Sequence, residues 1–142
     1  MQEQNFKNHS RLIFLWHGVT LFLTLAVLVG SIINLLHSDA HNHYSAVTLF
    51  GVSLIFPLLW AYTRIFALKA QDRAIRAEEG LRYFMLTGKP FDKQLRLGQI
   101  IALRFASDEE FPVLAKKAVE ANLSSKQIKE AIQNWRADYH RV

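Results

Sequence analysis

Two stretches of the sequence contain no Asp, Glu, Lys or Arg, and they constrain the fold more than any other feature. Residues 12–36 carry no charge unless His17 is protonated, and residues 44–63 carry none at all. A helix of about 20 apolar residues is long enough to cross the ~30 Å hydrocarbon core of a bilayer. The sequence therefore predicts an all-α membrane protein with two transmembrane helices, at residues 12–36 and 44–66, that form a hairpin.

Two other interpretations of these runs compete with membrane spans. The first run follows Lys7 and Arg11, as a secretory signal core would, but such a core is only ~7–15 residues long and precedes a small-residue cleavage site. The segment GSIINLLHSD offers no convincing site of that kind. A buried hairpin of a soluble protein is the second alternative, although core helices rarely run this long without a charge. Both runs are therefore expected to be membrane anchors.

Basic residues flank the two predicted spans on one side only. The basic residues nearest the spans are Lys7, Arg11, Arg64, Lys69, Arg73 and Arg76. The connecting loop at residues 37–43 contains neither Lys nor Arg. Because short cytoplasmic segments are enriched in Lys and Arg, the N-terminal segment at residues 1–11 and the C-terminal part at residues 67–142 should both be cytoplasmic. We therefore expect a multi-pass protein of the cytoplasmic membrane.

Polar residues recur along one face of the first predicted span. The spacing places His17, Thr20, Thr24, Ser31 and Asn34 in one row on the helix. Small and polar groups let helices approach each other and hydrogen-bond in lipid, so packing against the second span or between copies is the simpler interpretation. The alternative is a small transport or channel element that oligomerises around this face. Pro57 is expected to kink the second span.

The loop between the spans is rich in potential metal ligands. These are His37, Asp39, His41 and His43. Imidazole and carboxylate groups bind zinc, but only where their geometry is fixed. A tight connection between two helices also needs polar residues, and Ser38, Asp39 and Asn42 are ordinary choices for that purpose. We therefore expect a turn without a metal, and these four residues are the only candidates for a metal site.

Residues 67–142 are strongly charged and have the periodicity of several helices. The second span is expected to continue as a long helix to a stop at Gly88 and Pro90. Two helix-capping boxes are predicted, one from Ser107 to Glu110 and one from Ser124 to Gln127. The last helix is predicted to present one apolar face, formed by Ile128, Ala131, Ile132, Trp135 and Tyr139. This part of the chain is therefore predicted to be a small cytoplasmic helical bundle.

A bundle of this length has a marginal core, so we expect it to pack on the long helix that leaves the membrane, on a second copy or on a partner. The residues expected to face that partner are Leu81, Phe84, Met85, Trp135 and Tyr139. Near the membrane, Lys69, Arg73 and Arg76 fall within one arc of the long helix and are expected to contact anionic lipid headgroups. The expected partners are thus an anionic bilayer surface and either a second copy or another membrane protein.

The sequence carries no recognisable catalytic or cofactor-binding motif. It has no cysteine, which excludes thiol nucleophiles, disulfides and thiolate metal sites. It also lacks H-E-x-x-H, G-x-S-x-G and G-x-G-x-x-G. The formal net charge is +5, but basic residues alternate with acidic ones along the predicted helices, which is typical of solvated faces. We expect no enzymatic activity, no cofactor and no nucleic-acid partner.

Several segments resemble a family of small two-span bacterial membrane proteins of unknown function, found in Bacteroidota among others. The segments are EQNFKNHSR, RAIRAEEGLRYFMLTGKPF, QIIALRFASDEEFPVLAKKAVEANLSSKQIKEAIQNW and RADYHRV. The resemblance implies a location in the bacterial inner membrane but implies no activity. We therefore expect a non-enzymatic interaction or scaffold protein that presents a helical domain at the cytoplasmic face, with the transport element as the alternative.

Overall fold

The computed structural model describes residues 4–6, 8 and 12–139, and their regular elements are helices. This confirms the predicted all-α class for the part of the chain that is described. The chain divides into two compact units, one at residues 12–67 and one that combines residues from the N-terminal segment with the chain from residue 68 onwards. Lys7 and Arg11, which helped to orient the first predicted span, lie outside the described residues.

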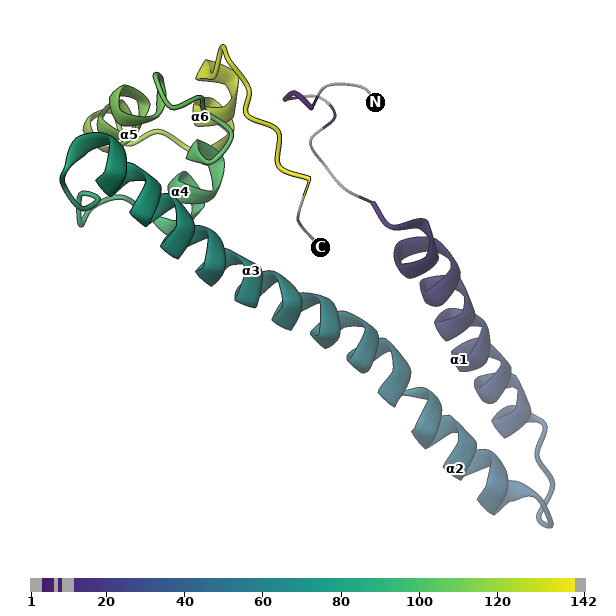
Figure 1. Ribbon diagram of the computed structural model, residues 1–142. Coiled ribbons are helices and arrows are strands. Elements are labelled where there is room, and N and C mark those ends of the chain that lie inside the picture. Colours follow the sequence, from purple (N-terminus) through teal and green to yellow (C-terminus); the bar gives the residue numbers. More distant parts are fainter. Residues whose placement is uncertain (1–3, 7, 9–11, 140–142) are drawn as a thin grey trace. The chain divides into compact units, whose positions relative to one another are not determined.

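The first unit is a hairpin of long apolar helices (Figure 1). A π-helical turn, Leu15–Thr20, leads into α1, Leu21–Leu36, and α2, His43–Ser53, is followed by the start of α3, Ile55–Thr87. The run from Leu15 to Leu36 and the run that begins at His43 are each long and apolar enough to cross a membrane. The π-helical geometry at the start was not predicted.

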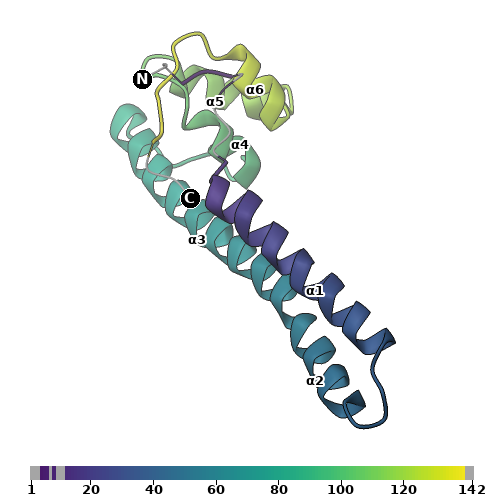
Figure 2. The ribbon, with the colours of Figure 1, turned by 90° about the vertical axis from the view of Figure 1, so that its right-hand side faces the viewer.

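The two arms of the hairpin, whose backbones are drawn in Figure 2, are joined by hydrogen bonds and a ring contact. Near the middle, the Ser31 and Ser53 hydroxyl oxygens lie 2.7 Å apart and share a hydrogen bond. Nearer the chain's N-terminal end, the Trp16 and Trp60 rings stack with centroids 6.2 Å apart, and the Trp60 indole nitrogen donates to the Trp16 carbonyl oxygen at 3.1 Å. The arms are thus held together by a few polar contacts and by close packing.

The second apolar run is interrupted once, between α2 and α3 at Leu54. A proline ring inside a helix clashes with the carbonyl group four residues earlier and cannot donate the hydrogen bond to it. For Pro57 that carbonyl belongs to Ser53, the last residue of α2. The helix is thus interrupted close to Pro57, and the position of the break follows from the i−4 rule.

The second unit is a small helical bundle built on the C-terminal part of α3. Gly88, with φ +70°, ends α3 in the left-handed region that favours glycine, as predicted. It is followed by α4, Leu97–Leu103, α5, Phe111–Glu120, and α6, Ser125–Ala131 (Figure 1). The most buried large side chains of the core are Ile100, Leu103, Phe105, Phe111 and Ile128. Tyr83 and Phe91 pack against this core from the end of α3 and the loop that follows it.

Only one of the two predicted capping boxes forms completely. Ser124 Oγ accepts a hydrogen bond from the Gln127 backbone N–H, and Gln127 Oε1 accepts one from the Ser124 backbone N–H. The box predicted from Ser107 to Glu110 forms only in half: Ser107 Oγ accepts a hydrogen bond from the Glu110 backbone N–H at 3.4 Å, but the Glu110 carboxylate does not return to Ser107, and α5 begins at Phe111. That carboxylate accepts hydrogen bonds from the backbone N–H groups of Gln133 and Asn134.

The last predicted helix is also shorter than expected. It ends at Ala131, Ile132 has an extended backbone, and residues 132–139 contain no further helix. The backbone of these residues pairs with the segment between α4 and α5: the Ser107 N–H donates to the Asn134 carbonyl, and the Arg136 N–H donates to the Phe105 carbonyl. These long-range bonds replace the local bonds that would have continued the helix.

Candidate functional site

Most large apolar side chains of the hairpin are exposed in the isolated chain. Phe22 is 70% exposed, Leu58 58% and Phe66 61%, and only about one tenth of each apolar window is buried. Soluble monomers rarely expose contiguous apolar surfaces larger than a few hundred Å². A helix that is apolar all round needs an apolar environment on every side. The hairpin surface is therefore a candidate lipid-binding surface.

The predicted polar row on the first helix is only partly turned into the hairpin. Thr24 and Ser31 are buried, at 8% and 2% exposure, whereas His17, Thr20 and Asn34 remain partly exposed. The hydroxyls of Thr20, Thr24 and Ser31 each donate to a backbone carbonyl of their own helix, and Ser31 also bonds Ser53. These hydroxyls are satisfied within the hairpin, as helix packing requires.

The loop histidines take part in local hydrogen bonds. His37 Nδ1 lies 2.8 Å from the Ile33 carbonyl, and His43 Nδ1 lies 2.9 Å from Ser38 Oγ. Asp39 Oδ1 accepts from the Asn42 N–H at 2.9 Å and closes a turn. Within the described residues, His37, Asp39, His41 and His43 do not gather into a group that could hold a metal ion.

A cluster of charged side chains joins α3 to the loops of the helical domain. Arg82 lies at its centre, with Nη1 2.9 Å from Glu79 Oε2 and Nη2 2.6 Å from Asp108 Oδ1. Arg82 Nη2 also donates to the Ala106 carbonyl at 2.7 Å, and the guanidinium carbon lies 4.5 Å from the centroid of the Phe111 ring. One side chain thus ties three chain segments together.

Glu79 is an unusual carboxylate because it is almost fully buried, with the residue 7% exposed. Burial raises the pKa of Glu79 above its ordinary value, while the hydrogen bond and positive charge of Arg82 and the charge of Arg136 oppose the rise. Arg136 Nη1 is 3.9 Å away, so Arg82 is the closer of these two partners. The ionised form of Glu79 therefore depends mainly on Arg82.

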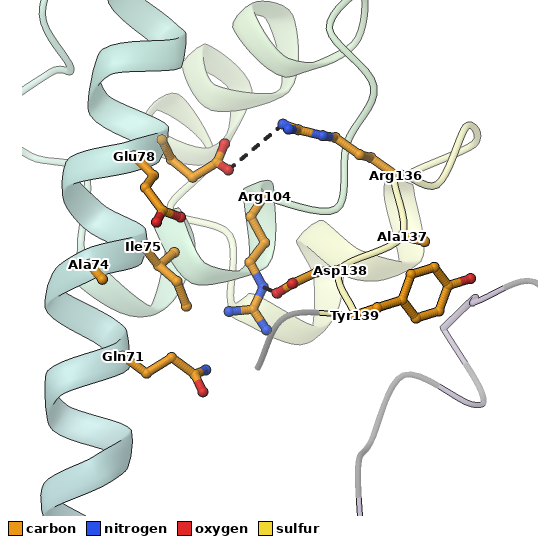
Figure 3. Close-up of a pocket in the computed structure, with 10 residues that line it drawn as sticks. Gln71, Ala74, Ile75, Glu78, Arg104, Arg136, Ala137, Asp138 and Tyr139 are labelled. Atoms are coloured by element: carbon orange, nitrogen blue, oxygen red, sulfur yellow. Dashed lines mark ion pairs between the residues drawn. The ribbon is translucent and has the colours of Figure 1, made fainter. Parts of the chain in front are cut away.

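A cavity of about 450 Å³ lies between α3 and the extended C-terminal segment (Figure 3). Its lining residues include Gln71, Ile75, Glu78, Arg104, Asp138 and Tyr139. Arg104 is 7% exposed, and its Nε lies 3.2 Å from Asp138 Oδ2. Asp138 is held further by Gln4, which exchanges two hydrogen bonds with its backbone. The cavity walls thus carry charges of both signs.

The residues predicted to contact partners or headgroups divide into two groups. Lys69, Arg73 and Arg76 are exposed, as are Leu81, Phe84, Met85 and Tyr139. Trp135 instead packs on the domain's own core, with its ring centroid 5.0 Å from that of Phe105. The expectation that Trp135 faces a partner assumed that the last helix continues through Trp135, but this helix ends at Ala131.

The charged cluster and the cavity were not predicted. Their members come from α3, the α4–α5 connection and the C-terminal segment, and no short sequence motif joins them. The sequence holds one indication of the charged cluster: helical spacing places Glu79 on the side of α3 that also carries Ile75 and Arg82. In chemical terms, the cluster neutralises buried charges and fixes loops.

Comparison with known proteins yields one match. Searches of curated proteins and of solved structures find no match to this chain. A family of unknown function, DUF6526, matches residues 1–142, which is the whole chain. The match agrees with the resemblance to a family without an assigned activity that was noted from the sequence. The chain belongs to the family of unknown function DUF6526.

Proposed function

We propose that this protein is a membrane-anchored interaction or scaffold protein. In this proposal the hairpin spans the bacterial inner membrane, both termini lie in the cytoplasm, and the helical domain is presented at the membrane face. The observation that carries the proposal is the exposure of apolar side chains along both arms of the hairpin. Lipid would cover this surface, and the lack of Lys and Arg in the loop supports the orientation.

The arrangement of charges in the helical domain supports a binding role. Glu79, Arg82 and Asp108 are combined in ion pairs that join chain segments, and Arg104 pairs with Asp138. Such pairs hold a small domain in one conformation. The exposed apolar residues Leu81, Phe84 and Met85 remain available for a partner.

The alternative proposal is a small transport element formed by several hairpins. Its only ionisable group in the polar row is His17, and the neighbouring threonine and serine hydroxyls are satisfied by backbone carbonyls. These bonds favour the scaffold proposal. If transport occurs, ion or solute flux into liposomes should fall when His17→Ala or Thr24→Leu is introduced, and unchanged flux in both variants would exclude this path.

The membrane topology can be tested by labelling single cysteines, because the wild-type chain contains none. His41→Cys lies in the loop between the spans, and Lys116→Cys lies on an exposed site of α5. In right-side-out membrane vesicles, a membrane-impermeant maleimide should label the His41→Cys protein and spare the Lys116→Cys protein. Inside-out vesicles should reverse the pattern.

The same preparations supply the controls. Both cysteines should react after detergent is added, which shows that each is chemically accessible. The protein should also stay in the pellet after extraction with alkaline carbonate. Labelling of both sites from one side, or release by carbonate, would contradict the proposed hairpin.

A further inference from the structure

The C-terminal half of α3 has an apolar face that the helical domain does not cover. Leu81, Phe84 and Met85 are 62%, 52% and 76% exposed. Ile75 and Glu79, on the other side of the same helix, are buried. Taking 100° per residue, Leu81 and Met85 lie more than about 60° from both. These apolar side chains belong to a part of α3 beyond the apolar run, so lipid tails do not explain them.

This face continues towards the membrane-proximal part of α3 with a regular spacing. Ala70, Ala74 and Ala77 precede Leu81 and Phe84 at intervals of four, three, four and three residues. The three alanines are exposed, and Ala74 also borders the cavity between α3 and the C-terminal segment. Alternation of three and four is the a/d pattern of a coiled-coil seam, in which apolar residues of one helix pack between those of another. We call these five residues the α3 seam.

The charged residues beside the α3 seam distinguish between possible partners. Arg73 and Glu78 are exposed and occupy the g and e positions on opposite edges of the seam, and on the Glu78 side that edge adjoins the cavity. In a parallel pair of helices, a g residue faces the e residue five positions later on the other helix, so Arg73 of each copy would face Glu78 of the other. In an antiparallel pair, like charges would meet. A second, parallel copy of this chain therefore fits the seam.

We propose that two copies of this protein associate through the α3 seam as a parallel pair, with reciprocal Arg73–Glu78 ion pairs. The inference rests on the proposed function, because a shared membrane orientation holds two α3 helices parallel and raises their effective concentration. Alanines at three of the five seam positions allow the backbones to approach closely, while Leu81 and Phe84 supply the larger apolar contacts. The partner is thus a second copy, and the site is one face of α3.

Cysteine cross-linking of the full chain in native membranes tests this pairing. In a parallel homodimer, equal positions on the seam face each other, so Ala77→Cys and Leu81→Cys should each form a disulfide-linked dimer on mild oxidation. Arg76→Cys is the matched control, since it is exposed but points away from the seam. We expect the cross-linked fraction of both seam variants to exceed that of the control by about fivefold or more, because a disulfide needs Cα atoms within about 7 Å. Equal fractions would overturn the proposal.

Charge reversal tests the orientation. Arg73→Glu or Glu78→Arg should each weaken dimerisation about fivefold, since two opposite-charge contacts become like-charge contacts. The double variant should recover the wild-type level. Recovery would not occur if Arg73 acted only through anionic lipid, and an antiparallel pair would not be weakened by either single change.

The outcomes also separate this inference from the proposed function. Correct labelling of His41→Cys with no seam cross-link would leave the anchor intact and exclude the dimer. Seam cross-links in a protein that carbonate releases from membranes would support the dimer and contradict the anchor.

Discussion

Replacing Arg82 with Ala is expected to destabilise the helical domain by about 3–5 kcal/mol, which is the usual cost of removing one partner of a buried ion pair. Arg82 bonds Glu79, Asp108 and the Ala106 carbonyl, and its side chain is 12% exposed. Without it, the ion-pair partner left to Glu79 among the described residues is the more distant Arg136, at 3.9 Å. Amide hydrogen exchange of α4–α6 peptides in the full-length protein, in nanodiscs, would measure the change in the free energy of opening.

The effect of Arg82→Ala should depend on pH through Glu79. Burial raises the pKa of Glu79 in the folded state, and Arg82 opposes that rise, so the variant's pKa should lie higher still. A group with a raised folded pKa favours the folded state below its unfolded pKa, and that contribution is lost as the pH rises through the folded pKa. The stability that Arg82→Ala loses should therefore shrink as the pH falls towards 4.5, the ordinary pKa of a glutamate carboxyl.

Two variants control this prediction. Adding Glu79→Gln to Arg82→Ala removes the stranded carboxylate, so the double variant should regain part of the lost stability and lose the extra pH dependence. Arg136→Ala, at a side chain that is 55% exposed, should cost less than about 1 kcal/mol. If Arg82→Ala lowers the free energy of opening as little as Arg136→Ala does, the cluster does not stabilise the domain.

Apolar patterns and helix-terminating residues in the sequence were enough to predict the elements of the fold. The lengths of the apolar runs predicted the hairpin helices, Gly88 predicted the end of α3, and Pro57 predicted the break in the second run. Ser124 also forms the capping box expected of it. Apolar run length is a property of a whole segment, whereas Gly88, Pro57 and Ser124 act on residues within about one helical turn, and that is the range over which hydrogen-bond and steric rules act.

Contacts between distant segments could not be predicted in the same way. Ile128, Trp135 and Tyr139 have helical spacing, yet the helix ends at Ala131. The backbone that follows instead forms hydrogen bonds with residues 105–107. The same pairing brings Gln133 and Asn134 to the Glu110 carboxylate. A pattern in one segment identifies an apolar face but does not identify the surface that covers it. The charged cluster and the cavity both arise from such pairings.

Replacing Phe111 with Ala is the second change with a large expected effect, again about 3–5 kcal/mol for a fully buried aromatic residue. Phe111 is 0% exposed. Its ring meets those of Tyr83 and Phe91 edge to face, with centroids 5.8 and 6.0 Å apart. The substitution would leave a cavity where α5 packs on α3, beneath the Arg82 guanidinium. The amides of α5 should exchange hydrogen faster, and the free energy of opening derived from their exchange should fall by the same amount.

The neighbouring Val113 provides the matched control, because it is on the same helix and 71% exposed. Val113→Ala should change the free energy of opening by no more than about 0.5 kcal/mol. Phe111→Leu refills part of the cavity and should recover a large share of the loss, which would attribute the effect to packing. The hairpin does not include Phe111, so membrane retention and His41→Cys labelling should be unchanged while α5 opens more readily. Loss of membrane retention together with domain stability would instead mean that the hairpin needs the folded domain for insertion.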